Sequence, residues 1–420
     1  MKVLFLCGGV GKRMFPLAED KVLLKFLGKT LLEHQLDTAQ KAGLHRFIIV
    51  ANPVNLARIE GITTRYQKAE FEIVLQKKPL GIADALVNAR HLLNDEILLV
   101  NPNDIFENTV YTNLLAARRK EKTTAIITGY KVSNYFPGGY LVVNKRGGLT
   151  RILEKPGKGN EPSDMVNILA HLHTDPETLL HYIARVKTNK DDVYEQAIDA
   201  MCKAACPIKV VPYSDAWTPI KYPWHILDVV RYFLDRAEAF ISPHASISAH
   251  AVIDGKVILE EGVRVLENAV VRGPVYIGRN TVIGNSTLVR SYSHFGADCV
   301  VGFGTEIKGS YVGDGTQFHM NYAGDSVIGA QCSFGAGTIT ANWRFDNKTV
   351  QVKVGDTMID TGRDKLGAFV GDNCRTGIQV SIMPGVRIGN NAVIDPQVNL
   401  TNDVEADTLV HNHSPRKSFT

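Results

Sequence analysis

The sequence has no long apolar run and little net charge, and each absence excludes a class of protein. No stretch reaches the roughly 18 consecutive apolar residues that a membrane-spanning helix needs, so we expect no membrane association. The apolar segment at the N-terminus ends at Gly8, which predicts a first β-strand and not a signal peptide. The formal net charge is only +4 at pH 7, and this small excess gives no reason to expect nucleic acid as a partner.

Cysteines are few and are not spaced to bind a metal. The sequence has six of them, and the two closest, Cys202 and Cys206, are four positions apart. No C-x-x-C pair is present, so we do not expect a zinc site. Scattered cysteines of this kind fit a reducing compartment, and we therefore expect the protein in the cytoplasm.

Two segments with different patterns divide the 420 residues, as expected for a chain too long for one ordinary domain. Residues 1 to about 230 alternate short β-branched apolar runs with stretches of helical periodicity. The strand-like runs lie at 46–50, 72–75, 96–100 and 124–130, and the helix-like stretches lie at 31–43 and 82–93. This alternation predicts a Rossmann-like α/β domain over 1–230 with a mostly parallel sheet.

From residue 241 the pattern changes to a period of six. Every sixth residue from Ile241 to Ile307 is apolar, and the next residue is repeatedly glycine, as at Gly278, Gly284 and Gly302. A period of six fits neither a plain helix nor a plain strand, and it indicates a parallel β-helix over 241–410. We expect a three-sided prism whose aliphatic side chains stack inside, with glycine at the corners because it tolerates unusual backbone dihedrals.

Two interruptions break the repeat, and departures from a regular pattern tend to mark function. The first lies around 311–325. The second covers 342–369, where alternating Val350, Val352 and Val354 predict a pair of strands that projects from the prism. The last 15–20 residues are polar, and we expect a loose tail there.

A glycine-rich turn follows the first predicted strand. Gly8, Gly9 and Gly11 would let the backbone approach a ligand closely and cradle phosphate with N–H groups, and Arg13 and Lys21 follow them. The segment resembles the signature G-x-G-[TS]-R, followed by P-K-P, of the sugar-1-phosphate nucleotidyltransferases. In that family the arginine and lysine neutralise the triphosphate and the leaving pyrophosphate, which implies catalytic roles for Arg13 and Lys21.

Further matches to this family follow in order along the chain. QKKPLGIADA at 76–85 is similar to the loop that contacts the nucleotide base, which implies that role for Gln76 and Gly81. Asp104 stands where the family has a magnesium-binding aspartate, so Mg²⁺ is the implied cofactor. Glu154, in LEKP, and Asn167 match the residues that contact the sugar.

The sequence departs from this family's pattern at several positions, among them Lys12, Asp20, Val22 and Asn103, and two further departures bear most on activity. The later motif W-x-D-I-G reads Trp217-Thr218-Pro219 here, so proline replaces a second metal ligand, with Asp215 as a conceivable substitute. The sugar-binding N-A-G reads Asn167-Ile168-Leu169. These departures keep open an alternative in which the front domain retains the fold but not the activity.

The first interruption of the repeat carries a different motif. FHMNYAGD, followed by GAGT and AN, is similar to the acetyltransferase site of bifunctional enzymes that make UDP-N-acetylglucosamine, in its archaeal form. The matching residues include His319, Tyr322 and Asn342. An amine must lose a proton to attack a thioester, and histidine has a suitable pKa for this general-base role. The resemblance assigns that role to His319 and substrate positioning to Tyr322 and Asn342.

Basic residues near this motif match positions that hold the sugar phosphate. The resemblance implies that role for Arg290 and Lys308; Lys348 matches a further basic position, for which an ordinary surface charge is an equal alternative. It also implies acetyl-CoA as co-substrate, a left-handed β-helix and a homotrimer, since acetyl-CoA lies between adjacent prisms in this family.

The leading hypothesis is a bifunctional enzyme that acts on small molecules. The β-helix would acetylate an amino-sugar 1-phosphate, with glucosamine 1-phosphate favoured, and the front domain would couple the product to a nucleoside triphosphate, with UTP favoured. One alternative is an acetyltransferase with an inactive front domain. Another is a non-enzymatic oligomer that senses nucleotide sugars.

Overall fold

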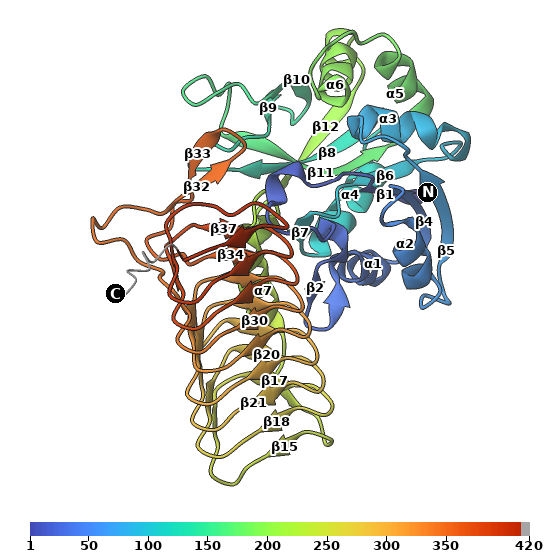
Figure 1. Cartoon of the computed structure of the whole chain (residues 1–420). Helices are drawn as coiled ribbons and strands as arrows, with labels where there is room; N and C mark the ends of the chain where they lie inside the picture. The colour runs from blue at the N-terminus through green and yellow to red at the C-terminus, as the bar shows by residue number, and fades with distance from the viewer. Residues whose placement is uncertain (413–420) are drawn as a thin grey trace, which may run out of the picture. The chain divides into compact units, whose positions relative to one another are not determined.

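The computed structural model describes residues 1–412, which form two compact units (Figure 1). The front unit consists of Met1–Val10, Asp20–Leu23 and Thr30–Pro219. The β-helix unit consists of Gly11–Glu19, Leu24–Lys29 and the chain from Ile220 onward. The domain boundaries expected from the sequence, 1–230 and 241–410, remain a prediction. No helix within residues 1–412 is long and apolar enough to cross a membrane.

The front unit is built on a mixed nine-stranded sheet. Its path runs β10-β9-β11-β6-β1-β4-β5, with β8 joined to β11 and β12 joined to β8. The strands are β1 (Lys2–Cys7), β4 (Arg46–Ala51), β5 (Glu70–Leu75), β6 (Ile97–Val100), β8 (Ala125–Lys131), β9 (Gly139–Val143), β10 (Leu149–Glu154), β11 (Met165–His173) and β12 (Ile208–Tyr213). The four strands β6, β1, β4 and β5 pair in parallel, as the alternation predicts.

Helices cover both faces of this sheet. Side chains alternate along a strand, so Val3 and Phe5 of β1 belong to one apolar cluster and Leu4 to another. The helices are α1 (Leu31–Lys41), α2 (Leu56–Thr63), α3 (Gly81–Asn88), α4 (Thr109–Lys120), α5 (Pro176–Ile183) and α6 (Val193–Lys203), with the short turns η2 (Lys21–Leu23) and η3 (Arg90–Leu92). The short turn η1 (Lys12–Met14) belongs to the β-helix unit. A separate antiparallel pair joins β7 (Asp104–Phe106) to β13 (Trp217–Pro219).

The C-terminal chain winds into three parallel sheets, which confirms the β-helix (Figure 1). The first sheet contains β14 (Phe240–Ile241), β17 (Val257–Leu259), β20 (Val275–Ile277), β23 (Ser293–Phe295), β26 (Tyr311–Val312), β29 (Val327–Ile328), β34 (Phe369–Val370) and β37 (Arg387–Ile388). The second contains β15 (Ser246–Ile247), β18 (Arg264–Val265), β21 (Val282–Ile283), β24 (Val300–Val301), β27 (Gln317–Phe318), β30 (Ser333–Phe334), β35 (Arg375–Thr376), β38 (Val393–Ile394) and β40 (Leu409–Val410).

The third sheet carries two of the predicted acetyltransferase residues, Lys308 and Tyr322. Its strands are β16 (Val252–Asp254), β19 (Val270–Arg272), β22 (Leu288–Val289), β25 (Glu306–Lys308), β28 (Tyr322–Gly324), β31 (Ile339–Thr340), β36 (Ser381–Ile382) and β39 (Asn399–Leu400). Repeating aliphatic side chains such as Leu259, Ile277 and Ile307 are fully buried in one continuous core. Two further elements of this unit are the helix α7 (His225–Arg236) and the strand β2 (Lys25–Phe26), which pairs with β3 (Lys29–Thr30).

The repeat glycines serve close packing, and the reason predicted for them is wrong. Gly278, Gly284 and Gly302 do not adopt a positive φ. A Cβ atom at Gly278 would lie 2.5 Å from the carbonyl oxygen of Gly296 in the next coil, and one at Gly284 would lie 2.7 Å from that of Val301. The left-handed corner dihedral occurs two residues later, and its bearers include Asn280, Ser286, Asp298 and Gly304.

The hexad-free insertion forms the predicted strand pair. β32 (Gln351–Val354) and β33 (Thr357–Asp360) pair antiparallel and project from the coils, orange in Figure 1. The prediction of a loose tail is wrong at Leu409–Val410, because this segment pairs with β38 as strand β40. The rest of that prediction, at 413–420, lies outside the described residues.

Candidate active sites

Four predicted residues of the β-helix line one cavity of about 450 Å³. Register explains why they meet. Leu288, Glu306, Tyr322 and Ile339 stand side by side on neighbouring strands of the third sheet, so residues at equal places in successive coils project together. The cavity is lined by Arg290, Lys308, Tyr322, Asn342, Trp343 and Lys365.

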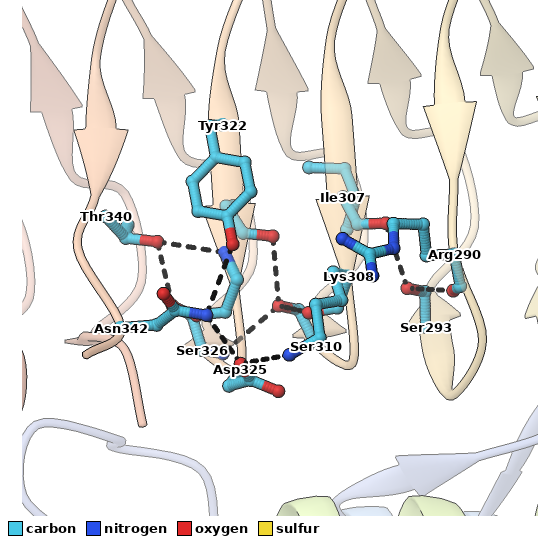
Figure 2. Close-up of polar contacts among 12 residues, drawn as sticks. Arg290, Ser293, Ile307, Lys308, Ser310, Tyr322, Asp325, Ser326, Thr340 and Asn342 are labelled. Carbon is cyan, nitrogen blue, oxygen red and sulfur yellow. Dashed lines mark hydrogen bonds and ion pairs between the residues drawn. The ribbon is translucent and has the colours of Figure 1, made fainter. Parts of the chain in front are cut away.

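A hydrogen-bond network centred on Asp325 fixes this site (Figure 2). One carboxylate oxygen of Asp325, Oδ2, accepts from Nζ of Lys308 at 2.7 Å and from Nδ2 of Asn342 at 2.6 Å. The same Asn342 amide donates to the hydroxyl of Tyr322 at 3.2 Å. Burial, with smaller contributions from the charges of Asp325 and Glu306, raises the pKa of Tyr322. The tyrosine therefore stays a neutral hydroxyl that can donate to a substrate.

Gly324 leaves the space in which this network forms. A Cβ atom there would lie 2.5 Å from the Tyr322 hydroxyl and 2.7 Å from Nδ2 of Asn342. Hydroxyl groups link the coils behind the site: Ser326 Oγ bonds Thr340 Oγ1 at 3.1 Å, and Ser310 Oγ accepts from the Ser326 backbone N–H at 3.1 Å (Figure 2). The backbone beneath the cavity is thus cross-linked from coil to coil, which holds the polar side chains in place.

His319 lies in the bend that precedes Tyr322 in the chain. The backbone N–H of His319 donates to Oδ1 of Asn321 at 2.7 Å, and its carbonyl accepts from Oγ1 of Thr305 at 2.9 Å. Buried Asn321 therefore holds the bend, while the imidazole is exposed. His319 is not among the residues that line the cavity.

Lys348 also lies apart from the cavity, while two residues absent from the sequence prediction line it. Lys348 is exposed and is not a lining residue. Trp343 and Lys365 both line the cavity, and they form a β-bridge with each other. Trp343 directly follows Asn342, so the sequence motif indicated the residue next to it. Lys365 lies at the far end of an insertion without a repeat, where no motif points to it.

In the front unit, the predicted nucleotide-binding residues Gly8, Gln76 and Gly81 lie together. The buried side chain of Gln76 fills the space where a Cβ atom of Gly8 would stand, so only glycine fits. Gln76 Nε2 donates to the carbonyl of Gly81 at 3.1 Å and to Oδ2 of Asp84 at 2.7 Å. Gly81 has a φ of +87°, a conformation that other residues rarely adopt. Gly9, by contrast, is exposed with open space around it.

Asp104 occupies a buried position at the start of β7. Its Oδ1 accepts from the indole N–H of Trp217 at 3.1 Å, and its Oδ2 accepts from Nδ2 of Asn101 at 3.1 Å. Pro219 stands directly opposite Asp104 in the antiparallel pair. The place next to the predicted metal ligand therefore holds a residue that cannot bind a cation. Asp215 accepts a hydrogen bond from Oγ1 of Thr109 at 2.6 Å.

The two predicted sugar-contacting residues face the same glycine. A Cβ atom at Gly139 would lie 2.7 Å from Oδ1 of Asn167 and 3.2 Å from Oε2 of Glu154. Glu154 pairs with Lys155 at 2.8 Å. Burial, followed by the charge of Glu154, raises the pKa of Glu195 to about 8, so the carboxyl of Glu195 is largely protonated at neutral pH. Glu195 is a residue that sequence motifs did not indicate.

The remaining signature residues are divided between the units. Gly11, with a φ of 60°, and Arg13 belong to the β-helix unit, where the guanidinium of Arg13 lies 5.8 Å from the ring centre of Tyr222. Lys21 lies in η2 of the front unit. Within residues 1–412, no group of three or more His, Cys, Asp or Glu side chains is arranged to hold a metal ion.

Comparisons with known proteins match both segments of the chain. Residues 2–216 match the family model described as nucleotidyl transferase. Residues 256–291 and 367–402 match the model for the bacterial transferase hexapeptide with six repeats. A crystal structure of UDP-glucose pyrophosphorylase complexed with UDP-glucose is 17% identical, with a TM-score of 0.51, and the match covers 56% of this chain and 99% of that one. At that identity the likeness shows the fold alone.

Curated relatives match nearly the whole chain. A bifunctional sugar-1-phosphate nucleotidylyltransferase/acetyltransferase of Sulfurisphaera tokodaii is 36% identical over 410 residues, covering 96% of this chain and 98% of that protein. The bifunctional protein GlmU of Methanococcus maripaludis is 34% identical, and that of Methanocaldococcus jannaschii is 32% identical. Each of these two matches covers 98% of this chain and 97% of the relative.

Proposed function

Because this chain belongs to the family of bifunctional sugar-1-phosphate nucleotidylyltransferases/acetyltransferases, we propose that it makes UDP-N-acetylglucosamine from glucosamine 1-phosphate, acetyl-CoA and UTP. The observation that carries the acetyl-transfer half is the cavity in which Lys308, Tyr322 and Asn342 are fixed around Asp325. A small anionic sugar suits a polar cavity of that size with cations on its wall.

In acetyl transfer, the amine of the sugar attacks the carbonyl carbon of the acetyl thioester. His319 takes the proton that the amine loses, the C–S bond breaks, and coenzyme A leaves as the thiol after protonation. Arg290 and Lys308 attract the phosphate, while the neutral Tyr322 hydroxyl and the Asn342 amide orient the sugar. The exposed position of His319 suits a homotrimer, in which the active site lies between neighbouring copies.

In nucleotidyl transfer, a phosphate oxygen of the sugar attacks the α-phosphorus of UTP in line with the departing pyrophosphate. Arg13 and Lys21 neutralise the triphosphate, Gln76 and Gly81 contact the base, and Asn167 contacts the sugar with Glu154.

Asp104 would hold Mg²⁺ in this reaction. Magnesium sites in nucleotide-dependent enzymes use one or two carboxylates together with substrate phosphates and water, so a single carboxylate opposite Pro219 fits the ion. When bound, the ion would withdraw charge from the triphosphate. Asn101 and Trp217 hold the carboxylate of Asp104 in one orientation through their hydrogen bonds.

Two product assays on the purified full-length chain test this function. With Mg²⁺ and N-acetylglucosamine 1-phosphate, pyrophosphate release is measured with UTP, dTTP, GTP and CTP in turn, and we expect the highest rate with UTP. With glucosamine 1-phosphate and acetyl-CoA, we expect release of free coenzyme A.

The pattern of failure separates the alternatives. Coenzyme A release without pyrophosphate release from any nucleotide would identify an acetyltransferase with an inactive front unit. Binding of a nucleotide sugar by folded protein without either product would favour the sensor. A preference for another nucleotide would correct the base but keep the bifunctional reaction.

A further inference from the structure

The cavity of the β-helix unit has three cationic side chains on its wall, and they differ in how far protein carboxylates neutralise them. Arg290 pairs with Oε1 of Glu306 at 2.9 Å, and Lys308 pairs with Oδ2 of Asp325 at 2.7 Å. Lys365 has no carboxylate within ion-pair distance among residues 1–412. Its charge is the one that a bound anion would not have to share with a protein carboxylate.

The backbone around Lys365 is anchored to the network that shapes the cavity. Trp343 and Lys365 form an antiparallel β-bridge, the N–H of Leu366 donates to the carbonyl of Asn342 at 2.9 Å, and the N–H of Gly367 donates to that of Asp325 at 2.8 Å. Asn342 and Asp325 are the two residues that bind each other in the site. The segment Lys365–Gly367, at the end of the insertion, is thus fixed directly to the site.

Gly367 keeps this segment close to the coil. A Cβ atom there would collide with Oγ of Ser326 and with the carbonyl oxygen of Gly324, so no other residue fits without a shift. Residues opposite each other in an antiparallel bridge project to the same face. Trp343 and Lys365 therefore lie on one side, and both line the cavity.

We propose that Lys365 binds the phosphate of the amino-sugar 1-phosphate during acetyl transfer. The proposal rests on the acetyltransferase function and names a phosphate ligand that the family motif did not indicate. A phosphate monoester carries close to two negative charges at neutral pH, and a lysine ammonium with free donors binds it through charge-assisted hydrogen bonds. Arg290 and Lys308 then supply weaker attraction, because each already faces a carboxylate.

Lys348 is the competing candidate for this role. It matches the family's basic position, and both lysines are exposed, but only Lys365 lines the cavity. Its backbone N–H donates to Oδ1 of Asp346 at 3.3 Å, and Asp346 also pairs with Arg344 at 2.5 Å. Geometry within one chain thus favours Lys365.

Kinetics of the full-length enzyme separate the two lysines. The variants are Lys365→Ala, Lys365→Arg and Lys348→Ala, with Lys353→Ala as control, since Lys353 is an exposed lysine on β32 of the same insertion. Loss of one charge-assisted hydrogen bond predicts that Lys365→Ala raises the KM for glucosamine 1-phosphate by about ten- to a hundredfold. The KM for acetyl-CoA and kcat should each change by less than about threefold, Lys365→Arg should restore most of the affinity, and Lys353→Ala should match the wild type.

Three results would overturn the proposal. The first is an unchanged KM for glucosamine 1-phosphate in Lys365→Ala. The second is a raised KM for acetyl-CoA in that variant instead, which would assign Lys365 to a phosphate of the coenzyme. The third is a large rise in the KM for glucosamine 1-phosphate in Lys348→Ala alone. If the wild-type protein releases no coenzyme A, the acetyltransferase function itself fails. Calorimetric titration of glucosamine 1-phosphate into wild type and Lys365→Ala then tests the phosphate-binding role of Lys365. Equal affinity of the two proteins, or no binding to the wild type, would refute that role.

Discussion

The two units specify their sites in different ways. In the β-helix unit, equal positions in successive coils meet on one sheet, so Leu288 and Glu306 are neighbours because of the repeat itself. In the front unit, Gln76 follows β5, Asp104 begins β7 and Asn167 lies within β11, and only tertiary structure relates them. A repeat therefore carries positional information in its phase, whereas an α/β site depends on loops and strand ends whose proximity a period does not encode.

The largest effect should come from Asp104→Asn in the front unit. The change keeps the shape of the side chain but removes the charge that would bind Mg²⁺. We expect pyrophosphate release to fall by about 10³-fold, while coenzyme A release stays within about twofold of wild type. Paired assays on the same preparation measure both.

Trp217→Phe provides a graded control for that result. It removes the indole N–H that donates to Oδ1 of Asp104, together with part of the ring that packs against Tyr130 and Phe136, and we expect a loss of about tenfold. Full nucleotidyl transfer by Asp104→Asn would show that another group binds Mg²⁺ and would contradict the assignment of Asp104 as the ligand.

His319→Gln should impair the acetyl transfer of the β-helix unit and leave the nucleotidyl transfer of the front unit intact. Glutamine keeps a polar side chain but cannot take a proton, so we expect coenzyme A release to fall by at least about a hundredfold with pyrophosphate release unchanged. Since His319 does not line the cavity, the KM for glucosamine 1-phosphate should change little. A strong rise in that KM, with kcat preserved, would make His319 a binding residue and not the base.

Gly284→Ala tests the close packing of the coils. The new Cβ atom would lie 2.7 Å from the carbonyl oxygen of Val301, and we expect the free energy of unfolding of the β-helix to fall by about 1–3 kcal/mol. Ser286→Gly, two residues later at a φ of 57°, should change it by only about 0.5 kcal/mol. Urea titration with acetyltransferase activity as the probe measures both. An unchanged free energy of unfolding in Gly284→Ala would show that the coils accept a Cβ atom there and that close packing is not the reason for the glycine.

Sequence periodicity predicted the fold well wherever it was strong. The apolar runs at 46–50 and 72–75 became β4 (Arg46–Ala51) and β5 (Glu70–Leu75), and the hexads became the β-helix. The antiparallel part of the front sheet was not anticipated, because pairing of β11 with β6, β8 and β9 depends on contacts far apart in sequence. The glycines predicted for the corners stand two residues before the left-handed corner dihedral, because a sequence does not tell steric contact from dihedral need.

The sites were predictable to the extent that motifs mark them. Motif order indicated Lys308, Tyr322 and Asn342, which share one cavity. It could not indicate Lys365, because 342–369 has no repeat and its return to the site depends on how the inserted strands fold back. Nor could it show that His319 is exposed in a single chain, since that follows from the bend held by Asn321.

The smallest expected effect concerns two buried histidines of the front unit, His171 and His173. The hydroxyl of Tyr194 lies 2.7 Å from Nδ1 of His171 and 2.9 Å from Nε2 of His173. Burial lowers the pKa of His173 to about 4, and the pKa of His171 falls well below its usual value for the same reason, with a further contribution from His173. Both rings are therefore neutral in the folded chain at neutral and mildly acidic pH.

Acid should consequently weaken the front unit through these rings. Between about pH 6.5 and 4 the unfolded chain binds protons at His173 that the folded chain does not, so stability is fully present above pH 6.5 and is lost as the pH falls. At pH 5 His173 alone should lower the free energy of unfolding by about 1–2 kcal/mol relative to pH 7.5. His173→Gln should reduce that difference even if it lowers stability at both pH values, whereas His244→Gln, at an exposed position of the β-helix unit, should leave it unchanged. Denaturant titrations at the two pH values, followed by loss of nucleotidyl transfer, measure this difference in the free energy of unfolding. An identical pH dependence in His173→Gln would mean that the ring of His173 is not the acid-sensitive group.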